Sequence, residues 1–212
     1  MTNFQFYLAS HSPRRAQILQ NLGFRFELCG CEIDETPLPN EKGADYVWRM
    51  AVEKNKAARQ HWQQTKVGQY APHFAFPLPF LSADTSVILD DKILGKPKNE
   101  ADAAAMLRAL SGRTHQVITA VCVADDTHMH TAAQTSQVRF TSLTERDIQG
   151  YIATGEPMDK AGAYGIQQLG GAFVEHIEGS FSGVMGLPVF ETVALLKAFG
   201  VELFSFEPKE HA

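Results

Sequence analysis

Two adjacent arginines stand in a short turn near the N-terminus, where their chemistry would suit an anion. The turn reads Ser10-His11-Ser12-Pro13-Arg14-Arg15 and follows an aromatic-rich stretch, residues 4–9, that predicts a strand. Ser12 and Pro13 are typical of a helix start. Because a helix N-terminus favours negative charge, two arginines there oppose the helix dipole unless a bound anion offsets the cost. The segment predicts a phosphate site, although two solvated surface arginines explain it about as well.

A lysine and an aspartate stand at two further places that suit phosphate chemistry. Apolar residues at helical spacing predict a helix from Asp45 to about His61 and place Lys54 on its buried face. Asp84 ends a predicted strand that continues or restarts at Thr85, and an acid at a strand end can hold a metal ion or orient a water molecule. Each residue also has a simpler explanation. The Lys54 ammonium could extend to water, and Asp84 could cap a turn.

Two glycine-containing segments complete the candidates. Leu94-Gly95-Lys96-Pro97 carries a lysine but is no P-loop, because the first glycine of that motif is missing and Pro97 replaces its hydroxyl residue. The segment from Asp159 to Gln167 contains two glycines that would let the backbone approach a ligand, and the Gln167 amide could bind a base edge or a ribose. Taken alone, a connection with exposed polar groups explains this second segment better.

Composition excludes several classes of protein. The 212 residues carry a net charge of −5, which disfavours broad binding to nucleic acid or to anionic membranes. Three cysteines do not make a disulfide framework, and neither a targeting signal nor a run long enough to cross a bilayer is present. Zinc spacings, G-x-G-x-x-G and G-x-S-x-G are also absent. We therefore expect a cytoplasmic protein without nucleic-acid or membrane partners.

The elements that must position these residues alternate between strands and helices. Helices are predicted over 13–22, 45–61, 99–110, from 144 to about 155 and over 188–199; strands are predicted over 4–9, 81–89, 92–94, 116–124, up to 140 and over 172–177. Residues 27–41 look irregular, and residues 66–80 look like a loop or flap. This order predicts an α/β fold, and the hairpin-like strand pairs predict a mixed sheet.

Several of these segments together resemble the Maf family. The matching motifs, in order, are Leu8–Arg15, Ala83-Asp84-Thr85, Leu94–Pro97, Leu110–His115, Asp159–Gln167, Gly179-Ser180 and Val184–Pro188. The resemblance implies a single domain over residues 1–212, similar to inosine triphosphate pyrophosphatases, with a twisted mixed sheet, flanking helices and two lobes around a central cleft. It also implies dependence on Mg²⁺, Mn²⁺ or Co²⁺ and a homodimer. His11 departs from the family, which usually has a small residue there, and 66–80 is longer than usual.

The resemblance also assigns roles to individual residues. Asp84 corresponds to the catalytic acid-base residue and, with Glu35, to a metal ligand. The residues that correspond to the substrate site are Ser10, Arg14, Arg15, Lys54, Thr85, Lys96 and Gln167. The implied reaction is attack of water on the α-phosphorus of a nucleoside triphosphate, which releases pyrophosphate and the monophosphate. Positioning and neutralisation of charge would supply most of the catalysis.

Three residues indicate which base the protein would accept. Arg14, Thr85 and Gln167 resemble the subgroup that acts on dTTP and UTP, rather than the one that acts on 7-methyl-GTP. Uracil and thymine present one acceptor and one donor, which a glutamine amide can match. A nucleotide-binding regulator of cell division or septum formation is the alternative from another class, but such a protein would not need Asp84 beside a basic cluster.

Overall fold

The computed structural model describes residues 4–66 and 78–204 and contains one seven-stranded sheet. The strands are β1 (Phe6–Leu8), β2 (Phe26–Leu28), β3 (Phe80–Leu89), β4 (Lys92–Leu94), β5 (Thr114–Ala124), β6 (Met129–Phe140) and β7 (Val174–Glu178). Their order is β2-β1-β3-β5-β6-β7. Strand β4 stands outside this order and pairs with the end of β3 from Val87 to Leu89. Strand β1 runs parallel to β2 and β3, whereas the other pairs are antiparallel. The predicted mixed sheet is confirmed.

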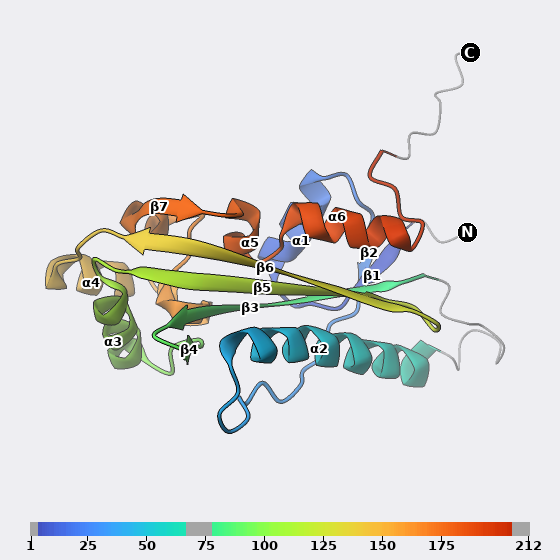
Figure 1. The fold of residues 1–212 in the computed structure, drawn as a ribbon, viewed down its shortest axis with the longest axis horizontal. Coiled ribbons are helices and arrows are strands. Elements are labelled where there is room, and N and C mark those ends of the chain that lie inside the picture. Colours follow the sequence, from blue (N-terminus) through green and yellow to red (C-terminus); the bar gives the residue numbers. More distant parts are fainter. Residues whose placement is uncertain (1–3, 67–77, 205–212) are drawn as a thin grey trace, which may run out of the picture.

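Helices cover both faces of this sheet (Figure 1). The long helix α2 (Gly43–Lys66) lies along one face. On the other face lie α1 (Pro13–Asn21), α5 (Phe181–Met185) and α6 (Val189–Ala198). Helices α3 (Glu100–Leu110) and α4 (Glu145–Ile152) pack together at the end of the sheet far from β1, beside three short 3₁₀ helices, η1 (Glu156–Asp159), η2 (Ala161–Ala163) and η3 (Leu169–Phe173).

Local sequence signals place several of these elements correctly. Asn99 caps α3 by accepting a hydrogen bond from the Asp102 amide, and Thr144 and Asp147 form a complete capping box on α4. The turn between β3 and β4 consists of Asp90 and Asp91, both with positive φ, as a tight hairpin requires.

Other boundaries differ from the prediction. Helix α2 begins at Gly43 and extends to Lys66, and β3 is one continuous strand from Phe80. The two end residues of the predicted loop over 66–80 therefore belong to regular elements, Lys66 to α2 and Phe80 to β3. Residues 67–77 lie outside the described residues. Residues 26–28, at the start of the stretch predicted to be irregular, form β2 because they pair with β1. Tertiary pairing overrides the weak local signal there.

Two apolar clusters lie on the sheet face opposite α2. Leu81 and Ala83 of β3 pack with α1 and α6, whereas Val87 and Leu89 pack with α3 and α4. Thr85 lies between them, and its hydroxyl is 2.9 Å from that of Thr119 on β5. This polar pair thus separates the two apolar clusters. The division into two lobes within a single domain stays a prediction.

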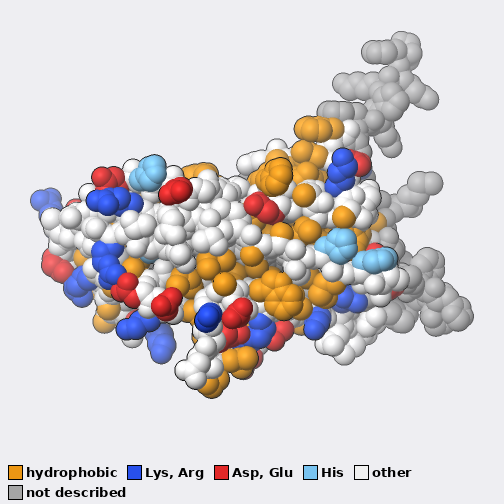
Figure 2. Space-filling view, viewed as in Figure 1, with side chains coloured by type: hydrophobic (Ala, Val, Ile, Leu, Met, Phe, Trp, Pro, Cys, Tyr) orange, Lys and Arg blue, Asp and Glu red, His pale blue; other side chains and the backbone are white. Residues whose placement is uncertain are grey.

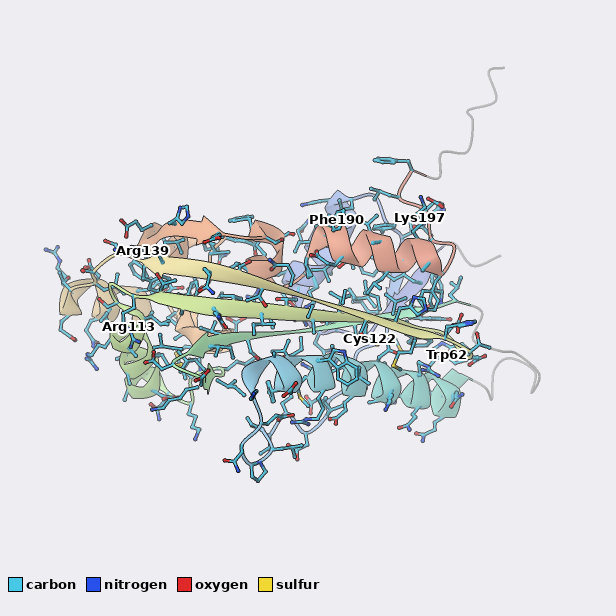
Figure 3. All side chains as sticks on the ribbon, in the orientation of Figure 1. Trp62, Arg113, Cys122, Arg139, Phe190 and Lys197 are labelled. Atoms are coloured by element: carbon cyan, nitrogen blue, oxygen red, sulfur yellow. The ribbon has the colours of Figure 1, made fainter. Side chains whose placement is uncertain are left out.

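The face covered by α2 has its own apolar cluster. Val47, Met50 and Ala51 of α2 pack against Ile118 and Cys122 of β5, and Figure 3 labels Cys122 between the sheet and the helix. This packing fixes the rotation of α2 about its axis. Lys54, which is seven residues after Val47, therefore faces the sheet as the periodicity predicted.

The surface differs between the two ends of the molecule. Figure 2 shows Lys, Arg, Asp and Glu side chains gathered at the end that α3 and α4 occupy, and more hydrophobic side chains over the middle and near α6. Phe190 on α6, labelled in Figure 3, is 81% exposed. Among the described residues, no helix combines the length and apolar character that crossing a membrane requires.

His115 on β5 makes stability depend on pH. Its ring packs edge-on against Phe140 and Tyr164, its Nε2 lies 2.8 Å from the Tyr164 hydroxyl, and burial lowers its pKa to about 4. Between pH about 6.5 and about 4 the unfolded chain therefore binds an extra proton, so stability falls as pH drops through this window, by at most about 1.4 kcal/mol per unit. We predict that His115→Gln flattens this decline, measured by chemical unfolding at several pH values.

A matched control is His128→Gln, because the side chain of His128 is 70% exposed. That variant should keep the decline of the original protein. An equally steep decline in His115→Gln would contradict the assignment to His115.

Candidate active site

The site forms where one edge of β3 has no neighbouring strand. Strand β1 pairs with β3 only at Phe80 and Leu81, and β4 pairs with it only from Val87 to Leu89. We call residues 82–86 of β3 the edge gap. Because successive side chains of a strand point to opposite faces, Asp84 faces α2 and Thr85 faces α1. Both sides of the sheet therefore contribute to one location.

On the α2 side, one ammonium joins two carboxylates. Lys54 Nζ lies 2.6 Å from Asp84 Oδ1 and 2.7 Å from Glu35 Oε1. The side chains of Lys54 and Asp84 are only 16% and 10% exposed, whereas that of Glu35 is 47% exposed. Glu35 follows β2 in an irregular segment, and its carbonyl accepts a hydrogen bond from the Tyr46 hydroxyl.

The charges around Glu35 keep it ionised. Partial burial alone would raise its pKa, but the hydrogen bond and charge of Lys54, with the charges of Lys96 and Arg15, hold the pKa below its ordinary value. The carboxylate therefore stays negative at neutral pH.

On the α1 side, the buried guanidinium of Arg15 is held by neutral acceptors. Its Nε donates to the Gly186 carbonyl at 2.7 Å, its Nη1 to Ser10 Oγ at 3.3 Å and its Nη2 to Thr85 Oγ1 at 3.1 Å. Burial lowers the pKa of Arg15, an effect that the Asp84 charge opposes, but an arginine remains protonated at neutral pH. No carboxylate forms an ion pair with Arg15 within residues 4–66 and 78–204. A bound anion would supply the missing negative charge.

The start of α1 adds donors beside Arg15. Ser12 is the N-cap, but its side chain makes no capping bond, and the first turn holds no acid. The backbone amide of Ser12 donates to Ser10 Oγ at 3.1 Å, and this hydrogen bond closes the turn before α1. Amide groups at such an uncapped N-terminus can bind phosphate. His11 is exposed, and its ring lies against the backbone of Gly30.

The remaining predicted residues lie at the rim or farther away. Arg14 Nη1 is 3.7 Å from Asp159 Oδ2, and Lys96 is exposed without a hydrogen bond or ion pair to any described residue. Gln167 is exposed in a turn, and no described contact joins it to the others. The structure thus brings together Ser10, Arg15 and Thr85 on one side of β3 and Lys54, Asp84 and Glu35 on the other.

Sequence reasoning missed two charged residues at the rim. Asp159 contacts Arg14 and also accepts a hydrogen bond from Lys160 Nζ at 2.6 Å. Both residues stand in the glycine-containing segment already singled out, but only the tertiary contact with Arg14 shows their place.

Asp84 and Glu35 could supply two of the ligands of a divalent cation, but not a complete coordination shell. The carboxylates of Asp84 and Glu35 converge on a single point, which the Lys54 ammonium holds. Within the described part of the chain, no group of three or more His, Cys, Asp or Glu residues could hold a metal ion. Two carboxylates are nevertheless the protein share that Mg²⁺ commonly uses, since substrate phosphates and water complete its shell.

Comparison with known proteins identifies the family. The model of the family described as Maf-like protein matches residues 5–199. The chain therefore belongs to the Maf family. A protein of Pasteurella multocida named dTTP/UTP pyrophosphatase is 83% identical over 204 residues, which cover 96% of this chain and 100% of that protein.

Other proteins in the comparisons are less similar but cover nearly the same length. A nucleoside triphosphate pyrophosphatase of Haemophilus ducreyi is 52% identical over 93% of this chain and 96% of its own. A dTTP/UTP pyrophosphatase of Escherichia coli is 50% identical over 91% of this chain and 92% of its own. The solved structure of the Staphylococcus aureus Ham1 protein has a TM-score of 0.47 at 13% identity, covering 92% of this chain and 97% of that one.

The shared ammonium of Lys54 should contribute to stability. We predict that Lys54→Met lowers the free energy of unfolding by about 1–3 kcal/mol at pH 7, because Asp84 and Glu35 would lose their common cation. This value is below the cost of about 3–5 kcal/mol for removing one partner of a fully buried pair, because the Glu35 side chain is half exposed. Chemical unfolding at pH 7 and at pH 3 measures the effect. The loss should shrink at pH 3, where free carboxylates become neutral.

Lys96→Met is the matched control, because Lys96 is exposed and unpaired among the described residues. Its stability should stay within about 0.5 kcal/mol of the original protein. Equal effects of the two substitutions would show that the contacts of Lys54 contribute nothing special.

Proposed function

We propose that the protein hydrolyses dTTP and UTP to the monophosphate and pyrophosphate. The observation that carries the proposal is the buried Arg15, which forms no ion pair with a carboxylate of residues 4–66 or 78–204 and lies across the edge gap from Asp84 and Lys54. A triphosphate would supply the anion that Arg15 needs and would bring a phosphorus atom near the Asp84 carboxylate. The names of the relatives, at up to 83% identity in the comparisons reported above, support the same reaction and substrates.

In this mechanism, the α1 side of β3 binds phosphate. Arg15, Ser10 and the uncapped amides of α1 hold phosphate oxygens, while Arg14 and Lys96 add positive charge from the rim. Binding would replace neutral acceptors and the exposed Asp159 carboxylate with substrate oxygens. The substrate chain is thereby fixed relative to β3, which supplies the reacting group.

On the other side of the gap, Asp84 accepts the proton of the attacking water. Lys54 holds this carboxylate in place at 2.6 Å and can stabilise charge on the transition state. Asp84 and Glu35 are also the residues that would hold Mg²⁺, Mn²⁺ or Co²⁺. When bound with substrate, such an ion neutralises phosphate charge and makes coordinated water more acidic.

Two further aspects belong to the same proposal. The protein would act in the cytoplasm. It would also form a homodimer, and size-exclusion chromatography with light scattering tests this oligomeric state directly. A nucleotide-binding regulator of cell division or septum formation would bind the same nucleotides but release no pyrophosphate at a useful rate.

The first prediction of this proposal concerns Asp84. We expect Asp84→Asn to lower kcat by about 10²- to 10⁴-fold, because the amide cannot accept the proton of water. Release of pyrophosphate from UTP, measured with saturating Mg²⁺ or Mn²⁺, gives the rate. Asp90→Asn is a matched control, since Asp90 is in the β3–β4 turn and pairs with Arg113 on the surface. Near-normal turnover by Asp84→Asn would refute the assigned role.

The second prediction concerns the base. Under one metal ion, kcat/KM for dTTP and UTP should exceed that for CTP, GTP and 7-methyl-GTP by about tenfold or more. Cytosine reverses the donor and acceptor that uracil would present to the amide of Gln167, and a polar group left unmatched and buried in the complex costs about 1–3 kcal/mol. A preference for 7-methyl-GTP or for unmodified purines would overturn the subgroup assignment but not the pyrophosphatase reaction.

A further inference from the structure

The short loop that carries Gln167 is fastened at both ends. Between Gly165 and Gly170 the chain turns through Ile166, Gln167 and Gln168, whose side chains make no hydrogen bond to the rest of the described chain. The ends of the loop are bound to two side chains, Tyr151 of α4 and Glu156 of η1. We call this pair the loop clamp.

The loop clamp uses every polar atom of its two side chains. The Tyr151 hydroxyl accepts from the Gly165 amide at 3.1 Å and donates to Glu156 Oε1 at 2.8 Å. Glu156 Oε1 accepts from the Gly170 amide at 3.1 Å, and Oε2 accepts from the Leu169 amide at 3.1 Å. One tyrosine–glutamate pair thus binds the backbone on both sides of Gln167.

The glycines at the two ends of the loop lie close to other side chains. A Cβ atom on Gly165 would lie 2.6 Å from Lys160 Cε, and one on Gly170 would lie 2.5 Å from the Tyr151 hydroxyl. Burial raises the pKa of Tyr151 well above its ordinary value, so the hydroxyl keeps the proton that it donates. The ring itself packs in the core against Phe173. These contacts add to the hydrogen bonds that hold the clamped amides in place.

The loop clamp is also continuous with the rim of the site. Lys160, which is only 8% exposed, donates from Nζ to the Glu156 carbonyl and to Asp159 Oδ1, both at 2.6 Å. Asp159 in turn contacts Arg14 at the start of α1. The base of the loop is therefore tied to the phosphate side of the site through two residues.

We propose that Tyr151 and Glu156 are positioning residues that hold Gln167 where it can bind the base edge of a pyrimidine nucleotide. This inference rests on the proposed function, in which Gln167 distinguishes uracil and thymine from cytosine. A glutamine amide discriminates by direction as well as by distance. Holding the backbone on both sides of Gln167 limits how far its amide can move to suit the wrong base.

Glu156→Gln tests the inference with little change of volume. Its amide nitrogen can only donate, so at least one of the Leu169 and Gly170 amides loses its acceptor. We expect hydrogen exchange of these two amides to speed up by tenfold or more. The ratio of kcat/KM for UTP to that for CTP should fall about tenfold, with kcat for UTP at saturation within about threefold of the original.

Two comparisons isolate the effect. Glu175→Gln is the matched control, because Glu175 pairs with the exposed Arg139, which Figure 3 labels near α4. That variant should keep both the exchange rates and the UTP-to-CTP ratio. Adding Gln167→Ala to Glu156→Gln should lower the ratio by no more than about twofold further, since the two residues act together. Tyr151→Phe, which removes one hydroxyl, serves if Glu156→Gln does not fold.

The outcomes separate this inference from the function on which it rests. If Gln167→Ala alone lowers the UTP-to-CTP ratio but Glu156→Gln and Tyr151→Phe leave it unchanged, the positioning role is wrong and the base-binding role of Gln167 stands. If Gln167→Ala alone changes nothing, Gln167 does not bind the base, and both the inference and that part of the proposed function fail. Unchanged exchange of the Leu169 and Gly170 amides in Glu156→Gln would overturn the loop clamp itself.

Discussion

The guanidinium of Arg15 joins three segments that lie far apart in the sequence. It reaches Ser10 in the turn before α1, Thr85 on β3 and the carbonyl of Gly186 after α5, and it is 9% exposed. Neutral acceptors bind each of its three nitrogen atoms but leave its charge without an ion pair among the described residues. Since burying an unpaired charge is costly, the remaining packing must hold α1 and α5 in place around it. An anion bound at this point would reduce that cost, which links the stability of the fold to binding.

Strand β3 separates the guanidinium of Arg15 from the carboxylate of Asp84 at the edge gap. Asp84 and Thr85 are neighbours in sequence, yet the strand directs them to opposite faces. Lys54 and Glu35 gather around Asp84 on one face, and Arg15 and Ser10 gather near Thr85 on the other. The Asp84 carboxylate, which is the proton acceptor in the proposed mechanism, is thereby kept out of direct contact with the guanidinium that would bind phosphate.

Signals confined to a few neighbouring residues predicted the fold well. The caps at Asn99 and Thr144, the Asp90-Asp91 turn and the inward face of Lys54 depend on local backbone geometry, and all four are present. Strand β2 and helix α5 were missed because each has only a few residues and is stabilised by its partners. Motif resemblance named the residues that the structure brings together around the edge gap, and their roles stay predictions. It could not show that Asp159 meets Arg14 or that Glu156 binds the backbone near Gln167, because those contacts exist only once separate segments pack together.

The two ends of a nucleotide make different demands on a protein, and in the proposed function different parts of the structure would meet them. Phosphate binding depends on charge, which falls off slowly with distance, so exposed side chains such as Arg14 and Lys96 can contribute from the rim. Base recognition depends on hydrogen bonds that weaken steeply with a change of angle. It therefore needs a fixed backbone, which Tyr151 and Glu156 provide through bonds to three main-chain amides. Lys160 and Asp159 connect these two parts. Through their contacts, the backbone near Gln167 is linked to Arg14 at the start of α1.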